Sequence, residues 1–190
     1  MSHFMNAIRK LDSRKIRFEA TGIEAVEMKG IVVYDTYYGN TKIVADAIVE
    51  QVKAEGHEAE LHSVREIDSS PSQGEFLVVG SPIRMGKVTK RARKFVEGLN
   101  GEIWKDRSIM TFVTMLPPPG PEASEKQKES YEKWDIRAAQ QLRNLARAQG
   151  LRVADAVLMV YVKGLKGPLV EDGVEKTKQF VHNFIATLKK

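Results

Sequence analysis

The sequence contains no cysteine among its 190 residues. Disulfides and cysteine-ligated iron–sulfur clusters are therefore excluded, and any redox chemistry must come from a bound cofactor. The four histidines are scattered without the spacing of metal ligands, so we predict no metal site. No apolar run is long enough to cross a bilayer and the N-terminus has no signal-peptide core, so we expect a cytoplasmic protein.

Several motifs of nucleotide-binding and catalytic α/β proteins are also missing. The chain has neither the G-x-G-x-x-G fingerprint nor the G-x-x-x-x-G-K-S/T loop, which argues against Rossmann dinucleotide binding and P-loop hydrolysis. It has no G-x-S-x-G nucleophile elbow of a hydrolase. A response-regulator receiver needs an aspartate at the end of its third strand, where this chain has Gly80 and Ser81. The sequence therefore identifies no catalytic residue.

One segment has the layout of a phosphate-binding loop. Ile31 to Val33 form a β-branched run that predicts a buried strand, and the apolar spacing from Ile43 onward predicts a helix that Gly56 ends. Between them, residues 36–41 would present backbone N–H groups at a helix N-terminus, where an anion is favoured. We predict that Thr36, Asn40, Thr41 and the backbone of residues 37–39 bind a phosphate, although the same residue types also occur as a plain helix cap.

Strand and helix patterns alternate along the rest of the chain. Further strands are predicted at residues 58–63, 76–79, 109–113 and 153–162, and helices at residues 88–96, after Ser124 and at the C-terminus. Ser124 and Gln127 form a potential capping box for the long helix, whose apolar stripe includes Tyr131 and Trp134. This alternation predicts an α/β fold with a parallel sheet covered on both faces.

Residues 34–48, with the pattern Y-D-T-Y-Y-G-N-T-K-x-x-A, resemble the flavodoxin signature that binds the 5′-phosphate of flavin mononucleotide (FMN). This motif also resembles the corresponding motif in the flavodoxin domains of flavo-diiron proteins. The later segment S-P-I-R-M-G-K resembles the corresponding loop of menaquinone-dependent protoporphyrinogen oxidase, a flavodoxin-fold enzyme. The resemblance implies a flavodoxin-like, doubly wound, five-stranded parallel sheet in a three-layer sandwich, with FMN bound noncovalently at the carboxyl ends of the strands.

The resemblance also implies that three loops form the cofactor site. In chain order, the first, second and third loops are Thr36 to Thr41, Ser81 to Gly86, and Thr114 to Pro119. The predicted cofactor-binding residues are Thr36, Tyr37, Tyr38, Gly39, Asn40, Thr41, Ser81, Pro82, Ile83, Arg84, Met85, Gly86, Thr114, Met115 and Leu116. Flavodoxins usually stack aromatic residues of the second and third loops on the flavin. Here Ile83, Met85, Met115 and Leu116 take the nearest positions, and such side chains can still cover an apolar ring.

The sequence leaves the function open between an FMN-dependent electron carrier and a small flavin oxidoreductase. Alternatives are an oxidoreductase of quinone or porphyrinogen type and a flavin-free interaction module. The net charge of +5 favours an acidic redox partner protein or a small-molecule electron donor or acceptor, and we expect no nucleic-acid partner. Basic clusters at residues 87–94 and 9–17 are compatible with a peripheral membrane contact, and equally with a solvated surface.

We predict that the chain divides into an N-terminal extension, residues 1–28, and a flavodoxin-like domain, residues 29–190. In the extension, Phe4, Ile8 and Leu11 could line one side of a short helix. Such a helix would serve as an oligomer contact or as an arm packed on its own domain.

Overall fold

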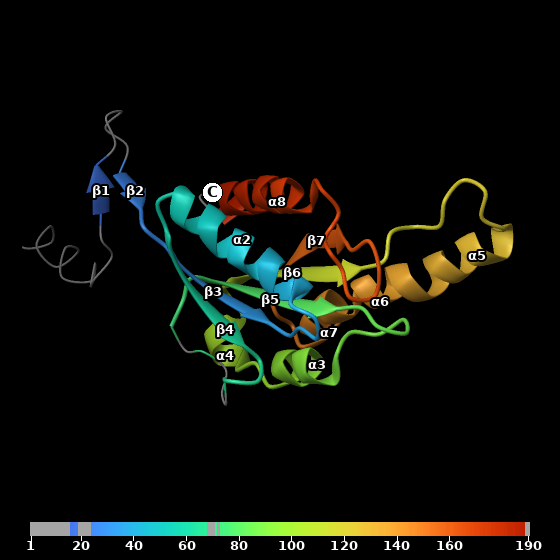
Figure 1. Ribbon diagram of the computed structural model, residues 1–190. Coiled ribbons are helices and arrows are strands. Elements are labelled where there is room, and N and C mark those ends of the chain that lie inside the picture. The colour runs from blue at the N-terminus through green and yellow to red at the C-terminus, as the bar shows by residue number, and fades with distance from the viewer. Residues whose placement is uncertain (1–15, 19–23, 68–70, 72, 189–190) are drawn as a thin grey trace, which may run out of the picture.

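The computed structural model describes residues 16–18, 24–67, 71 and 73–188, and its centre is a five-stranded, fully parallel sheet (Figure 1). The strands lie in the order β4-β3-β5-β6-β7. Their bounds are Lys29–Tyr34 for β3, Glu58–Ser63 for β4, Phe76–Pro82 for β5, Ser108–Met115 for β6 and Val153–Tyr161 for β7. The predicted fold class is confirmed, including the position of β4 at one edge.

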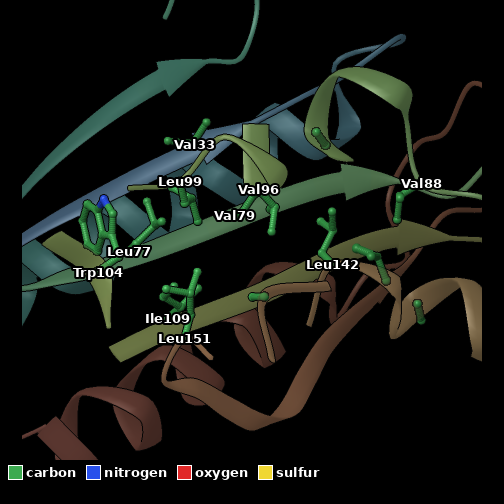
Figure 2. Packing of buried hydrophobic residues seen from close by; sticks show 14 of the residues in the cluster. Val33, Leu77, Val79, Val88, Val96, Leu99, Trp104, Ile109, Leu142 and Leu151 are labelled. Carbon is green, nitrogen blue, oxygen red and sulfur yellow. The ribbon is translucent and has the colours of Figure 1, made fainter. Parts of the chain in front are cut away.

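The strand residues pack alternately on the two faces of the sheet, because successive side chains of a strand point in opposite directions. Ile31 and Val33 belong to one buried cluster, and Val32 and Tyr34 belong to the other. Figure 2 shows the first cluster, in which Leu77 and Val79 of β5 lie among residues of the covering helices, including the fully buried Trp104. Both faces of the central strands are therefore dry, which explains their continuous apolar runs.

Helices cover the sheet on both sides (Figure 1). One face carries α2 and α8, which contact each other, and the opposite face carries α3, α4 and α7. The bounds are Asn40–Ala54 for α2, Lys90–Glu97 for α3, Gly101–Trp104 for α4, Gln141–Ala148 for α7 and Gly173–Leu188 for α8. Gly56 follows α2 with a φ of 82°, so the predicted glycine stop is confirmed.

Two strand glycines make room for aromatic rings of the neighbouring strands. A Cβ atom on Gly80 would lie within 2.5 Å of three ring atoms of Phe112, the side chain paired with it in β6. Gly30 accommodates the ring of Phe76 in the same way. Both rings are fully buried, so glycine is required at these positions for packing, not for backbone conformation.

The long helix predicted after Ser124 is broken into several pieces. It comprises α5 (Glu125–Ser130), a π-helical turn η1 (Tyr131–Ile136), α6 (Arg137–Ala139) and then α7, and α5 projects beyond the sheet (Figure 1). The predicted capping box at Ser124 is confirmed. The predicted apolar stripe is wrong at Trp134, which is 53% exposed, because the π turn changes the helical phase while Tyr131 stays buried.

Ahead of the domain, β1 (Ile16–Phe18) pairs antiparallel with β2 (Glu24–Val26). The predicted short helix with Phe4, Ile8 and Leu11 lies outside the described residues. Within the described part of the chain, every helix is too short or too polar to cross a bilayer.

Candidate functional site

The loops at the carboxyl ends of β3, β5 and β6 meet around one cavity of about 200 Å³. Parallel strands end at the same edge of the sheet, which is why segments far apart in sequence converge there. All but three of the predicted site residues line this cavity; the exceptions are Gly39, Ser81 and Gly86. Gly39 precedes α2, and Gly86 lies in a tight turn. Ser81 is buried and, like Pro82, still belongs to β5, so the second loop begins later than predicted.

The first loop leaves the N-terminus of α2 open to an anion. Gly39 has a φ of 90°, and no side chain caps the helix. The first N–H groups of a helix have no partner inside it, so they remain available for a ligand. The backbone N–H of Gly39 donates to Thr36 Oγ1 at 3.0 Å, which folds the loop and leaves the hydroxyl proton of Thr36 free to donate.

Two other polar side chains of this loop have partners inside the protein. Thr41 and Thr114 are buried, and their hydroxyl oxygens lie 2.8 Å apart, so the first loop is bonded to the end of β6. The Nδ2 atom of Asn40 donates to the carbonyl of Lys166 at 3.0 Å. The amide of Asn40 therefore holds the loop after β7 as well as facing the cavity.

A buried carboxylate, that of Asp35, holds the start of the first loop in place. Asp35 is fully buried and accepts two hydrogen bonds from Arg91, at 3.1 and 3.2 Å, and one from the backbone N–H of Thr36 at 2.9 Å. These bonds to Asp35 raise the pKa of the Arg91 guanidinium. Arg65 forms a second ion pair with Asp35 at 3.6 Å and also donates to the carbonyl of Thr36. Two arginines therefore pair with one carboxylate at the residue that precedes the loop.

The second loop is a two-residue hairpin. Arg84 and Lys87 exchange both backbone hydrogen bonds, at 2.9 and 3.1 Å, and the two central residues, Met85 and Gly86, have φ values of 50° and 67°. Positive φ at both central positions is typical of a type I′ turn. The hairpin is held by Gln141 of α7, which accepts from the N–H of Val88 and donates to the carbonyl of Gly86.

Arg84 covers two aromatic rings of the first loop. Its guanidinium carbon lies 4.8 Å from the ring centroid of Tyr37 and 5.5 Å from that of Tyr38. Arg91 approaches the Tyr37 ring as well, at 5.5 Å. These cation–π contacts connect the second loop to the first across the mouth of the cavity.

The third loop begins later than the sequence predicted. Thr114 and Met115 still belong to β6 and are buried, and Leu116 is the first residue beyond the strand. The carbonyl of Leu116 lies 3.4 Å from the hydroxyl of Tyr131, which can donate to it. Burial, together with the nearby Tyr161, raises the pKa of Tyr131 far above its ordinary value, so this phenol remains a neutral donor.

Sequence reasoning missed three residues that line the cavity. Val162 and Leu165 come from the segment after β7, and Asp135 comes from the π turn. The first two had a signal, because K-G-L-K-G-P follows the last predicted strand, whose carboxyl end lies at the same edge of the sheet. No signal in the sequence pointed to Asp135, because its orientation depends on the change of helical phase at the π turn.

The donor set and the lining fit an FMN group. The uncapped helix and the neutral donors of the first loop suit a phosphate, and the apolar side chains of Ile83, Met115 and Leu116 suit a flat ring. The cavity is smaller than the roughly 300–1,000 Å³ usual for such ligands, so the exposed rim would contribute to binding. Among the described residues, no three acidic or histidine side chains lie close enough together to hold a metal ion.

Comparison with known proteins identifies related sequences and structures. The model of the flavodoxin domain family matches residues 31–163. The chain is 36% identical to a flavodoxin of Aquifex aeolicus (strain VF5) over 78 residues, which are 40% of this chain and 42% of that relative. The chain therefore matches less than half the length of this relative.

Two solved structures show the same fold at low sequence identity. Oxidised flavodoxin 1 from Bacillus cereus has a TM-score of 0.64 and 17% identity, covering 83% of this chain and 97% of its own. Rubredoxin oxygen:oxidoreductase from Desulfovibrio gigas has a TM-score of 0.65 and 16% identity, covering 85% of this chain but only 36% of its own. The latter similarity is thus confined to about a third of a larger protein.

Proposed function

Because the chain belongs to the flavodoxin domain family, we propose that it binds FMN noncovalently in the cavity described above and transfers electrons through it. The observation that carries the proposal is the uncapped N-terminus of α2, which opens at the meeting point of three carboxyl-end loops. When bound, the flavin would supply the redox chemistry that a chain without cysteine lacks.

The residues of this chain have distinct tasks in the proposed site. The backbone of residues 37–39, with the hydroxyls of Thr36 and Thr41, would hold the phosphate by neutral donors, since the loop interior contains no lysine or arginine. Ile83, Met115 and Leu116 would exclude water from the ring, and Tyr37 and Tyr38, each about half exposed, would contribute at the rim. Asp35 would position the first loop without touching the ligand.

The proposal is tested by comparing two ligands on two forms of the protein. FMN and riboflavin differ only in the phosphate, so titrating both with the flavin fluorescence as readout isolates the phosphate contribution. We expect the double variant Thr36→Val/Thr41→Val to weaken FMN binding at least about tenfold, because each hydrogen bond to a charged group contributes about 1.5–3 kcal/mol. Riboflavin affinity should change much less.

The control is Thr187→Val, which removes the hydroxyl of an exposed threonine of α8, outside the residues that line the cavity. This variant should bind both ligands as the unchanged protein does. Equal FMN affinity in the double variant would place the phosphate elsewhere. A colourless protein that cannot be reconstituted with FMN would contradict the proposal and support the flavin-free interaction module.

A second candidate is an oxidoreductase of quinone or porphyrinogen type. It is favoured by the apolar side chains around the cavity mouth: Tyr37, Tyr38, Met85, Leu116 and Leu165 are all at least 46% exposed. Solvent-exposed apolar side chains gathered at one cleft often mark a binding site for an apolar ligand.

Steady-state turnover of menadione or protoporphyrinogen by the FMN-loaded protein distinguishes the enzyme from the carrier. Leu165→Ala should raise KM for such a substrate, whereas Val174→Ala, an exposed apolar residue of α8 outside the cavity, should leave KM unchanged. Absence of turnover with either substrate would leave the electron carrier as the supported function.

A further inference from the structure

The hairpin of the second loop contains two features that cost stability. Met85 adopts a left-handed backbone conformation, with a φ of 50°, which is unfavourable for any residue with a Cβ atom. Arg84 and Lys87 are directly opposite each other in the hairpin, so their side chains emerge on the same face, and like charges in this position repel. Core packing does not explain these features, because Met85 is 98% exposed and Lys87 is exposed, while Arg84 contacts the exposed rings of Tyr37 and Tyr38 at the cavity mouth. Strained backbone and unfavourable charge pairs of this kind are concentrated at functional sites, such as ligand-binding and protein-binding surfaces.

Further cations continue this surface on neighbouring elements. Arg84 and Arg91 both lie against the ring of Tyr37, and Arg91 and Arg65 both pair with Asp35. We call Arg65, Arg84, Lys87 and Arg91 the basic face. Asp35, the carboxylate that pairs with Arg65 and Arg91, is buried, while the four cationic side chains are exposed. Asp135 is the acidic residue that lines the same cavity as Arg84. In the described part of the chain, Arg84 and Lys87 form no ion pair with a carboxylate.

The composition next to these cations is that of a protein interface. Tyr37, Tyr38, Met85 and Trp134 are exposed, and Trp134 lies close to Gly86, since a Cβ atom on Gly86 would be 3.4 Å from Trp134 Cβ. Tyrosine, tryptophan, methionine and arginine are the residues enriched at protein–protein contacts. Arg84 and Arg91 are also held over aromatic rings, so less side-chain entropy is lost when they bind.

We propose that the basic face and the adjoining exposed aromatic residues dock an acidic redox protein next to the cavity. The inference rests on the proposed flavin function, because a partner held at the cavity mouth is near enough to exchange electrons with a ligand there. The positive field of the basic face accelerates encounter with a negatively charged partner, and the aromatic residues then form the short-range contact.

The test measures docking of a partner protein, and this measurement does not require bound flavin. An acidic iron–sulfur ferredoxin is titrated calorimetrically into the full chain at low ionic strength, and a basic cytochrome c serves as the probe of opposite charge. We expect the ferredoxin to bind with an affinity that falls as salt is added, and the cytochrome not to bind. Lys87→Glu should weaken ferredoxin binding about fivefold or more, because charges at the rim of an interface control encounter and its salt dependence.

The matched control is Lys105→Glu, which changes the net charge equally on the exposed residue after α4, at the other end of the sheet. It should retain ferredoxin affinity. Equal losses in the two variants, or no ferredoxin binding at all, would overturn the proposal.

Vesicles containing phosphatidylglycerol provide the remaining comparison. If the chain binds these vesicles, loses this binding in Lys87→Glu and does not bind the ferredoxin, then the basic face binds a membrane surface and the proposal is wrong. The visible spectrum of the same sample reports FMN separately, so a failure of docking is distinguishable from a failure of flavin binding.

Discussion

Asp35 places a buried negative charge one residue before the loop that we propose for the phosphate dianion. On its own such a charge would repel the ligand and would be costly to desolvate. Arg91 and Arg65 remove this conflict, because they pair with the carboxylate and leave an excess of positive charge beneath the loop. At the scale of single residues, the site thus depends on groups that never line the cavity.

We expect Asp35→Asn to lower the free energy of unfolding by about 1–2 kcal/mol, because the charge-assisted hydrogen bonds from Arg91 become neutral ones while both arginines stay exposed to solvent. Urea denaturation measures this loss. Asp46→Asn is the control, since Asp46 forms an exposed pair with Lys42 one helical turn away, and its loss should cost less than about 0.5 kcal/mol. Comparable losses in the two variants would show that Asp35 does not organise the loop.

Tyr131 gives the stability a dependence on alkaline pH. Burial raises the pKa of its phenol in the folded protein above the ordinary value of 10.0, so the unfolded chain releases this proton at lower pH than the folded protein. The stabilising contribution is complete below pH 10 and is lost as the pH rises toward the raised pKa. In Tyr131→Phe we therefore expect the free energy of unfolding to fall less steeply above pH 10. Parallel curves for the two proteins would mean that Tyr131 ionises as freely when folded as when unfolded.

Among the elements, the second-loop hairpin and the π turn depart from regular geometry, and both border the cavity. The hairpin has Met85 where a type I′ turn favours asparagine or glycine. The π turn orients Asp135 toward the cavity, buries Tyr131 and exposes Trp134. The regular strands and helices serve as the rigid support for these two irregular elements.

Met85→Asn would create the Asn-Gly pair that this turn type prefers. We expect it to stabilise the protein by about 1 kcal/mol in urea denaturation, because asparagine tolerates the left-handed conformation. Met85→Leu keeps the strain and the size of the side chain, so its stability should match that of the unchanged protein. A stability gain in the leucine variant would show that the methionine side chain, not the backbone, is the source of the cost.

At the scale of the whole molecule, folding brings together four chain segments that end at one edge of the sheet. A ligand that binds only this assembled edge stabilises the folded state by mass action. Free FMN at one hundred times its dissociation constant would add about 2.7 kcal/mol.

For a chain of this size, that stabilisation corresponds to an increase in Tm of about 5–10 °C. Thermal unfolding followed by circular dichroism measures the shift. The variant Thr36→Val/Thr41→Val should show a much smaller shift at the same FMN concentration, and an equal shift would mean that the ligand binds without the first loop.

The sequence by itself determined the fold class, and it predicted site residues most of which line the cavity. Apolar runs such as Ile31 to Val33 predict buried strands, and their alternation with amphipathic helices predicts a parallel sheet. The first loop was predictable for a local reason, because Thr36 and Gly39 lie between β3 and α2, and Thr41 lies in the first turn of α2. Local patterns were therefore sufficient wherever the relevant contacts are made by neighbours in sequence.

Only the tertiary structure decided which distant residues complete the site. Nothing near Asp35 in sequence predicts its pairing with Arg91, and nothing near Asn40 predicts its bond to the carbonyl of Lys166, 126 residues away. The need for glycine at position 80 likewise depends on a ring from the neighbouring strand. These contacts follow from strand order and helix packing, which bring residues together across the sheet at separations that no periodic pattern in the sequence encodes.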